Sequence, residues 1–228
     1  MKTDFVLFGP LHLAIILSIP LAIVLLSRMA RRSEQTAFRI RIALGRILTI
    51  NELGWYAYKI HHNDVHFPDR LPLNLCDLTQ WLSVIACFTL ARWSAEVAYF
   101  AGAGGAMMAV ITPDLWAPAY SYPTAQFFVA HNGIVIAVGT LVLGHMVTLT
   151  RRSIWRAFAV VNIYALCIGA FNAAFGANYM YLCSKPPNAS LLDYLGPWPI
   201  YILVGEAVAL AIFALLAIPF WKTTEPAS

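Results

Sequence analysis

The chain has 228 residues and a net charge of +4, with 60% hydrophobic and only 11% charged residues. A soluble domain carries about 25% charged residues, so this composition excludes an ordinary soluble enzyme and predicts a polytopic membrane protein. The length fits one compact transmembrane domain over residues 1–228. The four cysteines show no C-x-x-C spacing, so the sequence carries no zinc or redox motif.

Seven stretches are long and apolar enough to cross a bilayer, because a spanning helix needs roughly 20 mostly apolar residues. In chain order they cover about 5–26, 40–58, 72–91, 95–111, 124–149, 154–182 and 197–221. We therefore predict an all-α fold, a bundle of seven transmembrane helices. The fourth stretch carries small residues on one side, which predicts close packing against other helices; they are Gly102, Gly105, Ala106 and Ala109.

The basic residues predict how the bundle crosses the membrane. Seven spans place 4 of the 15 on the side of the N-terminus, namely Lys2, Lys59, Arg70 and Lys185. The other 11 fall on the opposite side: Arg28, Arg31, Arg32, Arg39, Arg41, Arg46, Arg92, Arg151, Arg152, Arg156 and Lys222. Because the cytoplasmic side of a membrane protein is enriched in Lys and Arg, this asymmetry predicts an N-terminus outside and a C-terminus inside.

Polar side chains concentrate near the outer ends of five predicted helices. At 1.5 Å per residue, they lie about 10 Å below the outer surface. The set comprises His12, Asn51, Glu52, Asn74, Cys76, Asp77, Gln80, His131, Asn132, Asn172 and Asn178. Polar residues inside a membrane are costly and indicate a functional site. The inner half has few counterparts, so we expect an outward-opening pocket and not a conduction path.

Helical spacing places several of these side chains on common faces. Asn74, Cys76, Asp77 and Gln80 fall within one arc of the third helix, and Asn172 shares a face of the sixth with Gly176 and Tyr179. One pocket lined by all of them is therefore expected. The predicted substrate-binding residues are Glu52, Asn74, Asp77, Gln80, Asn172, Asn178 and Tyr179.

The pocket carries the residues of a nucleophilic site. Cys76 is the candidate nucleophile and His131 the candidate base, because a nearby imidazole accepts the thiol proton and a thiolate attacks. Asn74, Asp77 or Asn172 would orient the imidazole or donate to an oxyanion. Alternatively, Cys76 packs as a small hydrophobic residue or forms a disulfide with Cys183.

Three non-catalytic interpretations compete with this one. The polar layer suits a binder or transporter of a small polar molecule, or it simply joins helices, although each such hydrogen bond contributes only about 0.6 kcal/mol. Metal binding would use either His61, His62, Asp64 and His66, or His12, Glu52 and His131, but the first group lies in a loop without regular ligand spacing. We expect no metal, no cofactor and no nucleic-acid partner.

The cavities themselves distinguish these interpretations. An enzyme acting on acyl lipids needs an apolar groove that reaches the polar layer. A binder needs a closed polar pocket of a few hundred Å³ or less, at the small end of ligand sites, and a transporter needs an inner vestibule as well.

The strings "LPLNLCDLTQW", "AHNG" and "FNAAFGANYMYLCSKPPNASLLDYLGPWPIYIL" carry a resemblance over essentially the whole chain. The sequence resembles the YwaF-type integral membrane proteins of bacteria, which are similar to a human transmembrane acyltransferase of ether-phospholipid metabolism. They are more distantly similar to androgen-induced membrane hydrolases of fatty-acid esters. The resemblance implies a multi-pass protein of the bacterial cytoplasmic membrane, membrane lipids or an acyl lipid as substrate, and Cys76 and His131 as the reacting pair.

Overall fold

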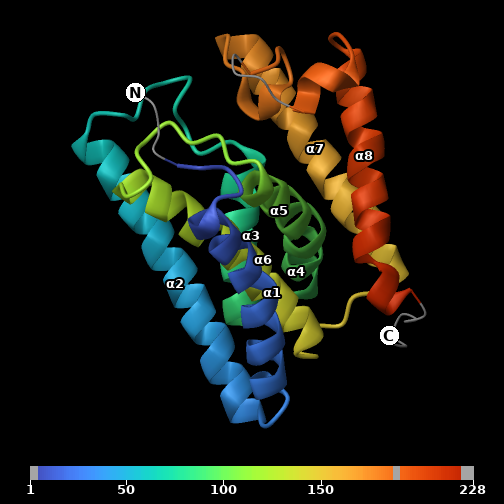
Figure 1. The fold of residues 1–228 in the computed structure, drawn as a ribbon. Coiled ribbons are helices and arrows are strands. Elements are labelled where there is room, and N and C mark those ends of the chain that lie inside the picture. The colour runs from blue at the N-terminus through green and yellow to red at the C-terminus, as the bar shows by residue number, and fades with distance from the viewer. Residues whose placement is uncertain (1–4, 187–190, 222–228) are drawn as a thin grey trace.

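A computed structural model describes residues 5–186 and 191–221, and their regular structure is entirely helical (Figure 1). The α-helices are α1 (Pro10–Ala30), α2 (Glu34–His61), α3 (Leu75–Thr89), α4 (Arg92–Val97), α5 (Gly104–Ile111), α6 (Tyr122–Leu143), α7 (Arg151–Phe175) and α8 (Ile200–Leu216). A π-helix, η1 (Ala98–Ala103), joins α4 to α5 without a break. Short 3-10 turns are η2 (Tyr179–Tyr181), η3 (Leu191–Leu195) and η4 (Ile218–Phe220). Counting 92–111 as one helix, the described residues form seven long helices, as predicted.

Local sequence signals explain where several helices begin. Ser33 precedes α2, and its hydroxyl accepts a hydrogen bond from the backbone N–H of Thr36 at 3.1 Å. Ser121 does the same for Thr124 ahead of α6, with Pro123 in the first turn. Such caps satisfy backbone N–H groups that have no partner inside the helix.

Two helices end earlier than predicted. The fifth ends at Leu143 and not near residue 149, and the sixth ends at Phe175 and not near residue 182. Gly176 explains the second difference, because its φ of +73° is left-handed and closes the helix. Asn178 therefore does not lie on α7, which corrects the prediction that it shares the helix with Asn172.

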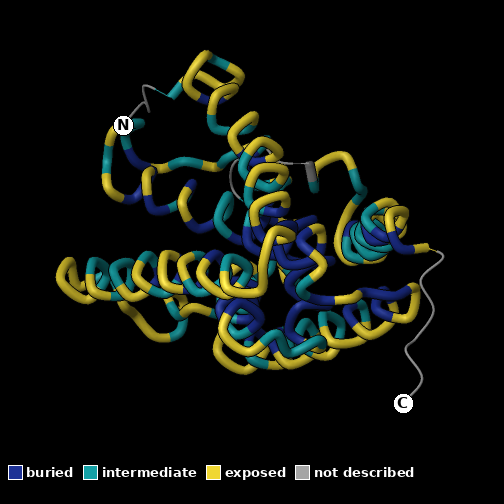
Figure 2. Tube along the Cα trace, turned by 90° about the horizontal axis from the view of Figure 1, so that it is seen from below, coloured by how far each residue is buried: buried dark blue, intermediate teal, exposed yellow. Residues whose placement is uncertain are grey.

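Among the described residues, four helices are long and apolar enough to cross a membrane by length and composition: α1, the continuous helix Arg92–Ile111, α6 and α7. Two shorter apolar helices, α3 and α8, accompany them. Figure 2 shows exposed positions along the outer sides of the helices, and many of the exposed residues are aliphatic, such as Leu166 of α7, which is 75% exposed. Exposed apolar surface of this extent is typical of a membrane-contacting face.

The buried core lies where α3, α6 and the 92–111 helix meet. On one side α1 and α2 pack against α6, and on the other α7 and α8 pack against α4 and η1 (Figure 1). The main polar link to α7 is Glu96 in α4, which accepts from Ser153 Oγ at 2.7 Å and pairs with Arg156 at 3.0 Å. Arg92 donates to the same carboxylate oxygen at 3.0 Å.

Two arginines, one directly after α1 and one in α2, bind backbone carbonyls at the ends of α6 and α3. Arg31 Nε donates to the carbonyl of Leu143 at 2.8 Å, where α6 ends. Arg41 donates to the carbonyls of Cys87 and Phe88 at 2.7 and 2.8 Å, in the last turn of α3. The opposite end, where α2 ends and α3 and α6 begin, is called the cavity end below.

Candidate functional site

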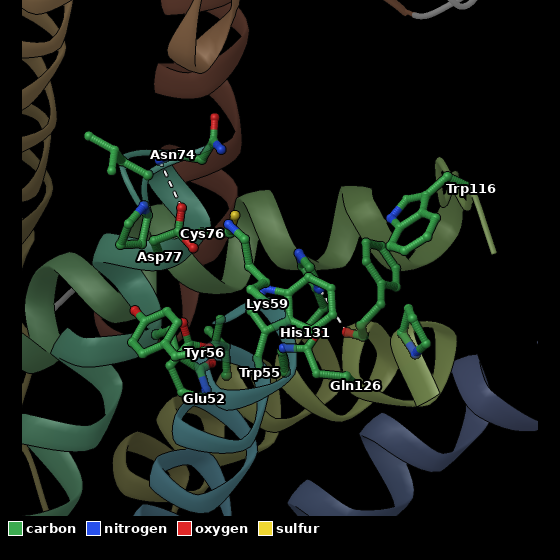
Figure 3. Close-up of a pocket in the computed structure, with 17 residues that line it drawn as sticks. Glu52, Trp55, Tyr56, Lys59, Asn74, Cys76, Asp77, Trp116, Gln126 and His131 are labelled. Carbon is green, nitrogen blue, oxygen red and sulfur yellow. Dashed lines mark hydrogen bonds between the residues drawn. The ribbon is translucent and has the colours of Figure 1, made fainter. Parts of the chain in front are cut away.

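A cavity of about 320 Å³, called the polar cavity here, lies between α2, α3 and α6 at the cavity end (Figure 3). Six of the residues singled out from the sequence line it: Glu52, Asn74, Cys76, Asp77, Gln80 and His131. Three different helices contribute them, so residues up to 79 positions apart in the chain are brought to one site. Its size lies at the small end of ligand sites.

Cys76 and His131 face the polar cavity from α3 and α6 respectively (Figure 3). His131 Nδ1 lies 2.8 Å from the carbonyl oxygen of Phe127. A carbonyl only accepts, so Nδ1 carries the proton and the lone pair is on Nε2. Within the described chain no hydrogen bond joins the Cys76 thiol to this ring. Both side chains line the same cavity, but no hydrogen bond of the described chain joins them.

Asn74 and Asp77 stabilise the start of α3. Asp77 Oδ2 accepts from the backbone N–H of Asn74 at 2.8 Å, the acidic half of a capping box. Asn74 Oδ1 in turn accepts from the backbone N–H of Met180 at 3.3 Å. Both polar side chains therefore have structural partners at the rim of the cavity, and they also fix Cys76 as the second residue of α3.

Glu52 and Gln80 line the polar cavity, and each has one buried oxygen without a hydrogen-bond partner in the described chain. Glu52 is 3% exposed and Gln80 2% exposed. Glu52 Oε1 and Gln80 Oε1 make no hydrogen bond in the described chain. Gln80 Nε2 donates to the carbonyl of Leu48 at 3.1 Å, which fixes the amide so that its oxygen is the free atom. A buried acceptor without a donor is costly, so this pair indicates a place for a donor group of a ligand.

Four aromatic side chains belong to the remaining wall. Trp55, Tyr56, Trp116 and Phe127 line the polar cavity (Figure 3), and Trp81 Nε1 donates to the Tyr56 hydroxyl at 3.0 Å. Trp55 and Tyr56 were not among the site residues predicted from the sequence. Both lie one turn beyond Glu52 on α2, and this spacing would have identified them as neighbours of Glu52 in the site.

Asn172, Asn178 and Tyr179 do not line the polar cavity, which corrects the expectation of one shared pocket. Asn172 is 1% exposed, and its amide bonds both the N–H and the carbonyl of Tyr179, at 3.0 and 2.9 Å. Asn178 binds the backbone of Cys183 and Ser184. These amides hold the chain after Gly176, where the α-helical hydrogen bonds of α7 have ended and only the short 3-10 turn η2 remains.

The Tyr179 hydroxyl joins this segment to the loop before α3. It donates to the carbonyl of Pro68 and accepts from the N–H of Leu71 at 2.7 Å. Burial raises the pKa of Tyr179 above its ordinary value, which keeps the hydroxyl protonated and able to donate. Its role in the fold is to fasten the segment after α7 to the start of α3.

A second cavity of about 430 Å³, called the apolar groove, adjoins the first. It shares Asn74, Cys76 and His131 with the polar cavity. The remaining lining is Leu75, Thr79, Ala101, Gly105, Ala106, Ala109, Met180 and Tyr181. Cys76 and His131 thus stand at the boundary between a polar and an apolar space.

Comparison with known proteins places the chain in a family. A model of the TMEM164 family, a family of transmembrane proteins, matches residues 7–217. This chain belongs to the TMEM164 family. No curated protein and no solved structure matches it.

The residues described for this TMEM164 family member do not support a disulfide, a metal site or a ligand-binding role for His12. All four cysteines are free, so the alternative of a Cys76–Cys183 disulfide does not hold. In the described ranges, no three His, Cys, Asp or Glu side chains cluster closely enough to hold a metal ion. Both ring nitrogens of His12 are engaged, Nδ1 by the N–H of Phe8 at 2.9 Å and Nε2 by the carbonyl of Val110 at 2.7 Å. His12 therefore joins α1 to the end of α5.

A further cavity of about 860 Å³ lies at the opposite end of this TMEM164 family member, beside Arg31 and Arg41. It shares no lining residue with the polar cavity. A transporter needs such a second cavity at the opposite end and also a path that joins it to the polar cavity. The two cavities share none of the lining that such a path would need.

Proposed function

We propose that this TMEM164 family member is a membrane-embedded lipid acyltransferase or acyl-ester hydrolase, with Cys76 as nucleophile and His131 as base. One observation carries the proposal: both residues line the polar cavity and the apolar groove at once. An acyl lipid has a polar head and an apolar chain that meet at the ester carbonyl. A lipid bound across the two cavities would place that carbonyl beside Cys76.

The reaction needs only groups that the chain supplies. His131 Nε2 takes the thiol proton, and the Cys76 sulfur attacks the ester carbonyl carbon. The carbon–oxygen bond to the departing alcohol breaks, and that alcohol takes the proton from His131. A second alcohol then gives its proton to His131 and attacks the carbonyl carbon of the Cys76 thioester. The carbon–sulfur bond breaks, the acyl group stays on the second alcohol as an ester, and the Cys76 sulfur takes the proton back from His131. Water in place of this alcohol gives hydrolysis.

The start of α3 supplies a place for negative charge during these steps. The first N–H groups of a helix have no partner within it, and Cys76 is the second residue of α3. When the Cys76 sulfur attacks the carbonyl carbon, negative charge forms on the carbonyl oxygen. This oxyanion would lie next to these N–H donors, as in other acyl-transfer sites. The unpaired oxygens of Glu52 and Gln80 would accept from N–H or O–H groups of the substrate head.

A second candidate is a non-catalytic binder of a small polar molecule. The specific observation in its favour is the pair of buried, unpaired acceptors, because a ligand with two donor groups would satisfy both without any reaction. The polar cavity is also of suitable volume, about 320 Å³. The apolar groove has no role in that function, and for this reason we place acyl chemistry first.

We further propose that the chain is a YwaF-type protein of the bacterial cytoplasmic membrane, with the N-terminus and the cavity end outside. The distribution of basic residues, 11 against 4, supports the orientation, and the resemblance of the three quoted sequence strings supports the YwaF-type assignment. In a variant freed of native cysteines, a membrane-impermeant maleimide should label His62→Cys in intact cells. Ser33→Cys should react only after the membrane is permeabilised, and the reverse pattern would overturn the orientation.

Labelling with a lipophilic acyl-type electrophile tests the catalytic proposal. We expect rapid labelling of the wild-type protein in detergent micelles, and no labelling of Cys76→Ser. His131→Ala should react more slowly by at least about 100-fold, because general-base catalysis contributes roughly 10²–10⁴-fold. Transfer of an acyl chain from a phospholipid to a lysophospholipid, measured by mass spectrometry, should fall in parallel.

Cys183→Ser is the matched control, since Cys183 is also a free, exposed cysteine but lines neither cavity. It should label and turn over like the wild type. Equal labelling of all four proteins would refute the acyl-enzyme and leave the binder as the better interpretation.

A further inference from the structure

The apolar groove has a floor of small residues and a wall of larger ones. Ala101, Gly105 and Ala106 belong to η1 and α5, while Met180 and Tyr181 belong to the segment after α7. A Cβ atom built on Gly105 would meet nothing within 4 Å, so Gly105 faces open space and not a packed helix. This corrects the prediction that the small residues of this helix all serve packing.

We propose that the apolar groove binds a single long acyl chain of the lipid substrate, and that Gly105 sets the length of chain it accepts. The inference rests on the proposed acyl chemistry and adds the binding site that would select the substrate. An apolar cavity of 150 Å³ holds a six-carbon ring. The groove, at about 430 Å³, therefore has room for roughly 15–18 carbon atoms on that scale.

Continuity with the polar cavity identifies the occupant. The two spaces share Asn74, Cys76 and His131, so one molecule can occupy both only if it is polar at one end and apolar at the other. A partner helix does not fit, because a helix is about 10–12 Å across and this volume holds only about one turn of it. A single acyl chain satisfies both conditions.

The opposite wall of the groove is held in place by specific contacts. Met180 and Tyr181 have φ values of +56° and +53°, a left-handed conformation that residues other than glycine rarely adopt. The structure maintains it through bonds to the backbone of this segment: Asn74 Oδ1 accepts from Met180 N, and the Tyr201 hydroxyl donates to the Tyr181 carbonyl. A wall fixed in this way gives the groove a defined width.

Chain-length selectivity tests the role of Gly105. In the acyl-transfer assay with donors of 8 to 18 carbons, Gly105→Leu should lower kcat/KM for the longest chains at least tenfold and change that for 8 carbons less than twofold. Leucine is a better helix former than glycine, so the variant should fold. Gly205→Leu is the control, because Gly205 in α8 also has nothing within 4 Å and lines neither cavity. An unchanged profile, or an equal loss at every length, would overturn the role of Gly105.

Photo-crosslinking tests the groove without relying on catalysis. The probe is a phospholipid with a diazirine in the middle of a 16-carbon chain, incorporated in vesicles with the Cys76→Ser variant. We expect crosslinks concentrated in peptides containing Ala101–Ala109 or Met180 and Tyr181, and their loss on adding Gly105→Phe but not Gly205→Phe.

Crosslinks spread evenly over the lipid-facing helices would refute the groove, even if Cys76 reacts with the electrophile. Groove crosslinks in a protein whose Cys76 does not react would uphold the chain-binding site and refute the acyl-enzyme. The two proposals therefore fail separately.

Discussion

Buried polar side chains that look alike in the sequence have different roles in this protein. Glu52 and Asn172 are both almost fully buried, on α2 and α7. Glu52 leaves Oε1 unpaired at the polar cavity, whereas the amide of Asn172 is used entirely by the backbone of Tyr179. The free oxygen of Glu52 can therefore accept a hydrogen bond from a ligand. The Asn172 amide cannot bind a ligand, because the backbone of Tyr179 already uses its donor and its acceptor.

Substituting these two residues should separate function from stability. Glu52→Gln keeps the shape but replaces one carboxyl oxygen by an NH₂ group, which donates and does not accept, and the loss of one hydrogen bond costs about 1 kcal/mol. We expect kcat/KM for acyl transfer, or ligand affinity, to fall about five- to tenfold while thermal unfolding is unchanged.

Asn172→Ala should behave in the opposite way. It leaves the buried N–H and carbonyl of Tyr179 without partners and should destabilise the protein by about 1–3 kcal/mol, measured by thermal unfolding in detergent. If Glu52→Gln destabilises the fold as much as Asn172→Ala, Glu52 is a structural residue and its free oxygen does not mark a binding site.

At the scale of single elements, helix ends were harder to predict than helices. Apolar composition extends past Phe175, so a spanning pattern continued to residue 182, but one backbone torsion at Gly176 ends α7. The early end releases residues 177–184 from the helix and allows Met180 and Tyr181 to form a wall of the apolar groove. Composition measures the hydrophobicity of a long stretch of chain, whereas the end of a helix depends on the backbone conformation of one residue.

Gly176→Ala tests this ending. A side chain in the left-handed region costs roughly 1–2 kcal/mol, so we expect destabilisation of that size in thermal unfolding. Gly205→Ala is the matched control: it lies inside α8 with open space around it, and alanine should be neutral or slightly stabilising there. Equal effects of both substitutions would show that α7 does not depend on the glycine conformation.

At the scale of the whole molecule, α7 and α8 form a separate layer beside the core. They contact it mainly through α4 and η1, and the polar link is the buried carboxylate of Glu96 with Ser153, Arg92 and Arg156. The apolar groove lies between α3, the helix 92–111, His131 of α6 and the segment after α7, and no residue of α7 or α8 lines it. The layer therefore bears on the groove only through Met180 and Tyr181, which follow α7 in the chain.

Glu96→Gln should loosen this layer. The loss of charge weakens hydrogen bonds from two arginines, which are 30% and 47% exposed, and we expect destabilisation of about 1–3 kcal/mol. Hydrogen exchange should increase in α7 more than in α3 or α6. Asp64→Asn, which breaks the exposed pair with Arg70, should cost less than about 1 kcal/mol. Uniform exchange across all helices would show that Glu96 does not join the layers.

The sequence by itself determined the all-helical fold, the seven long helices and the concentration of polar residues at one end. These follow from composition and helical spacing, which act along the chain. Six of the residues that the sequence indicated line the polar cavity: Cys76, Asp77 and Gln80 on α3, Asn74 directly before it, Glu52 on α2 and His131 on α6.

Only the tertiary structure decided which polar side chains face a cavity and which bind the backbone. Asn172 and Asn178 turn to a segment whose path depends on Gly176, and Gly105 faces open space because no neighbouring helix covers it. The apolar groove was not visible in the sequence for the same reason. A cavity forms where neighbouring elements leave a space. The spacing of residues within one helix does not show where the neighbouring elements lie.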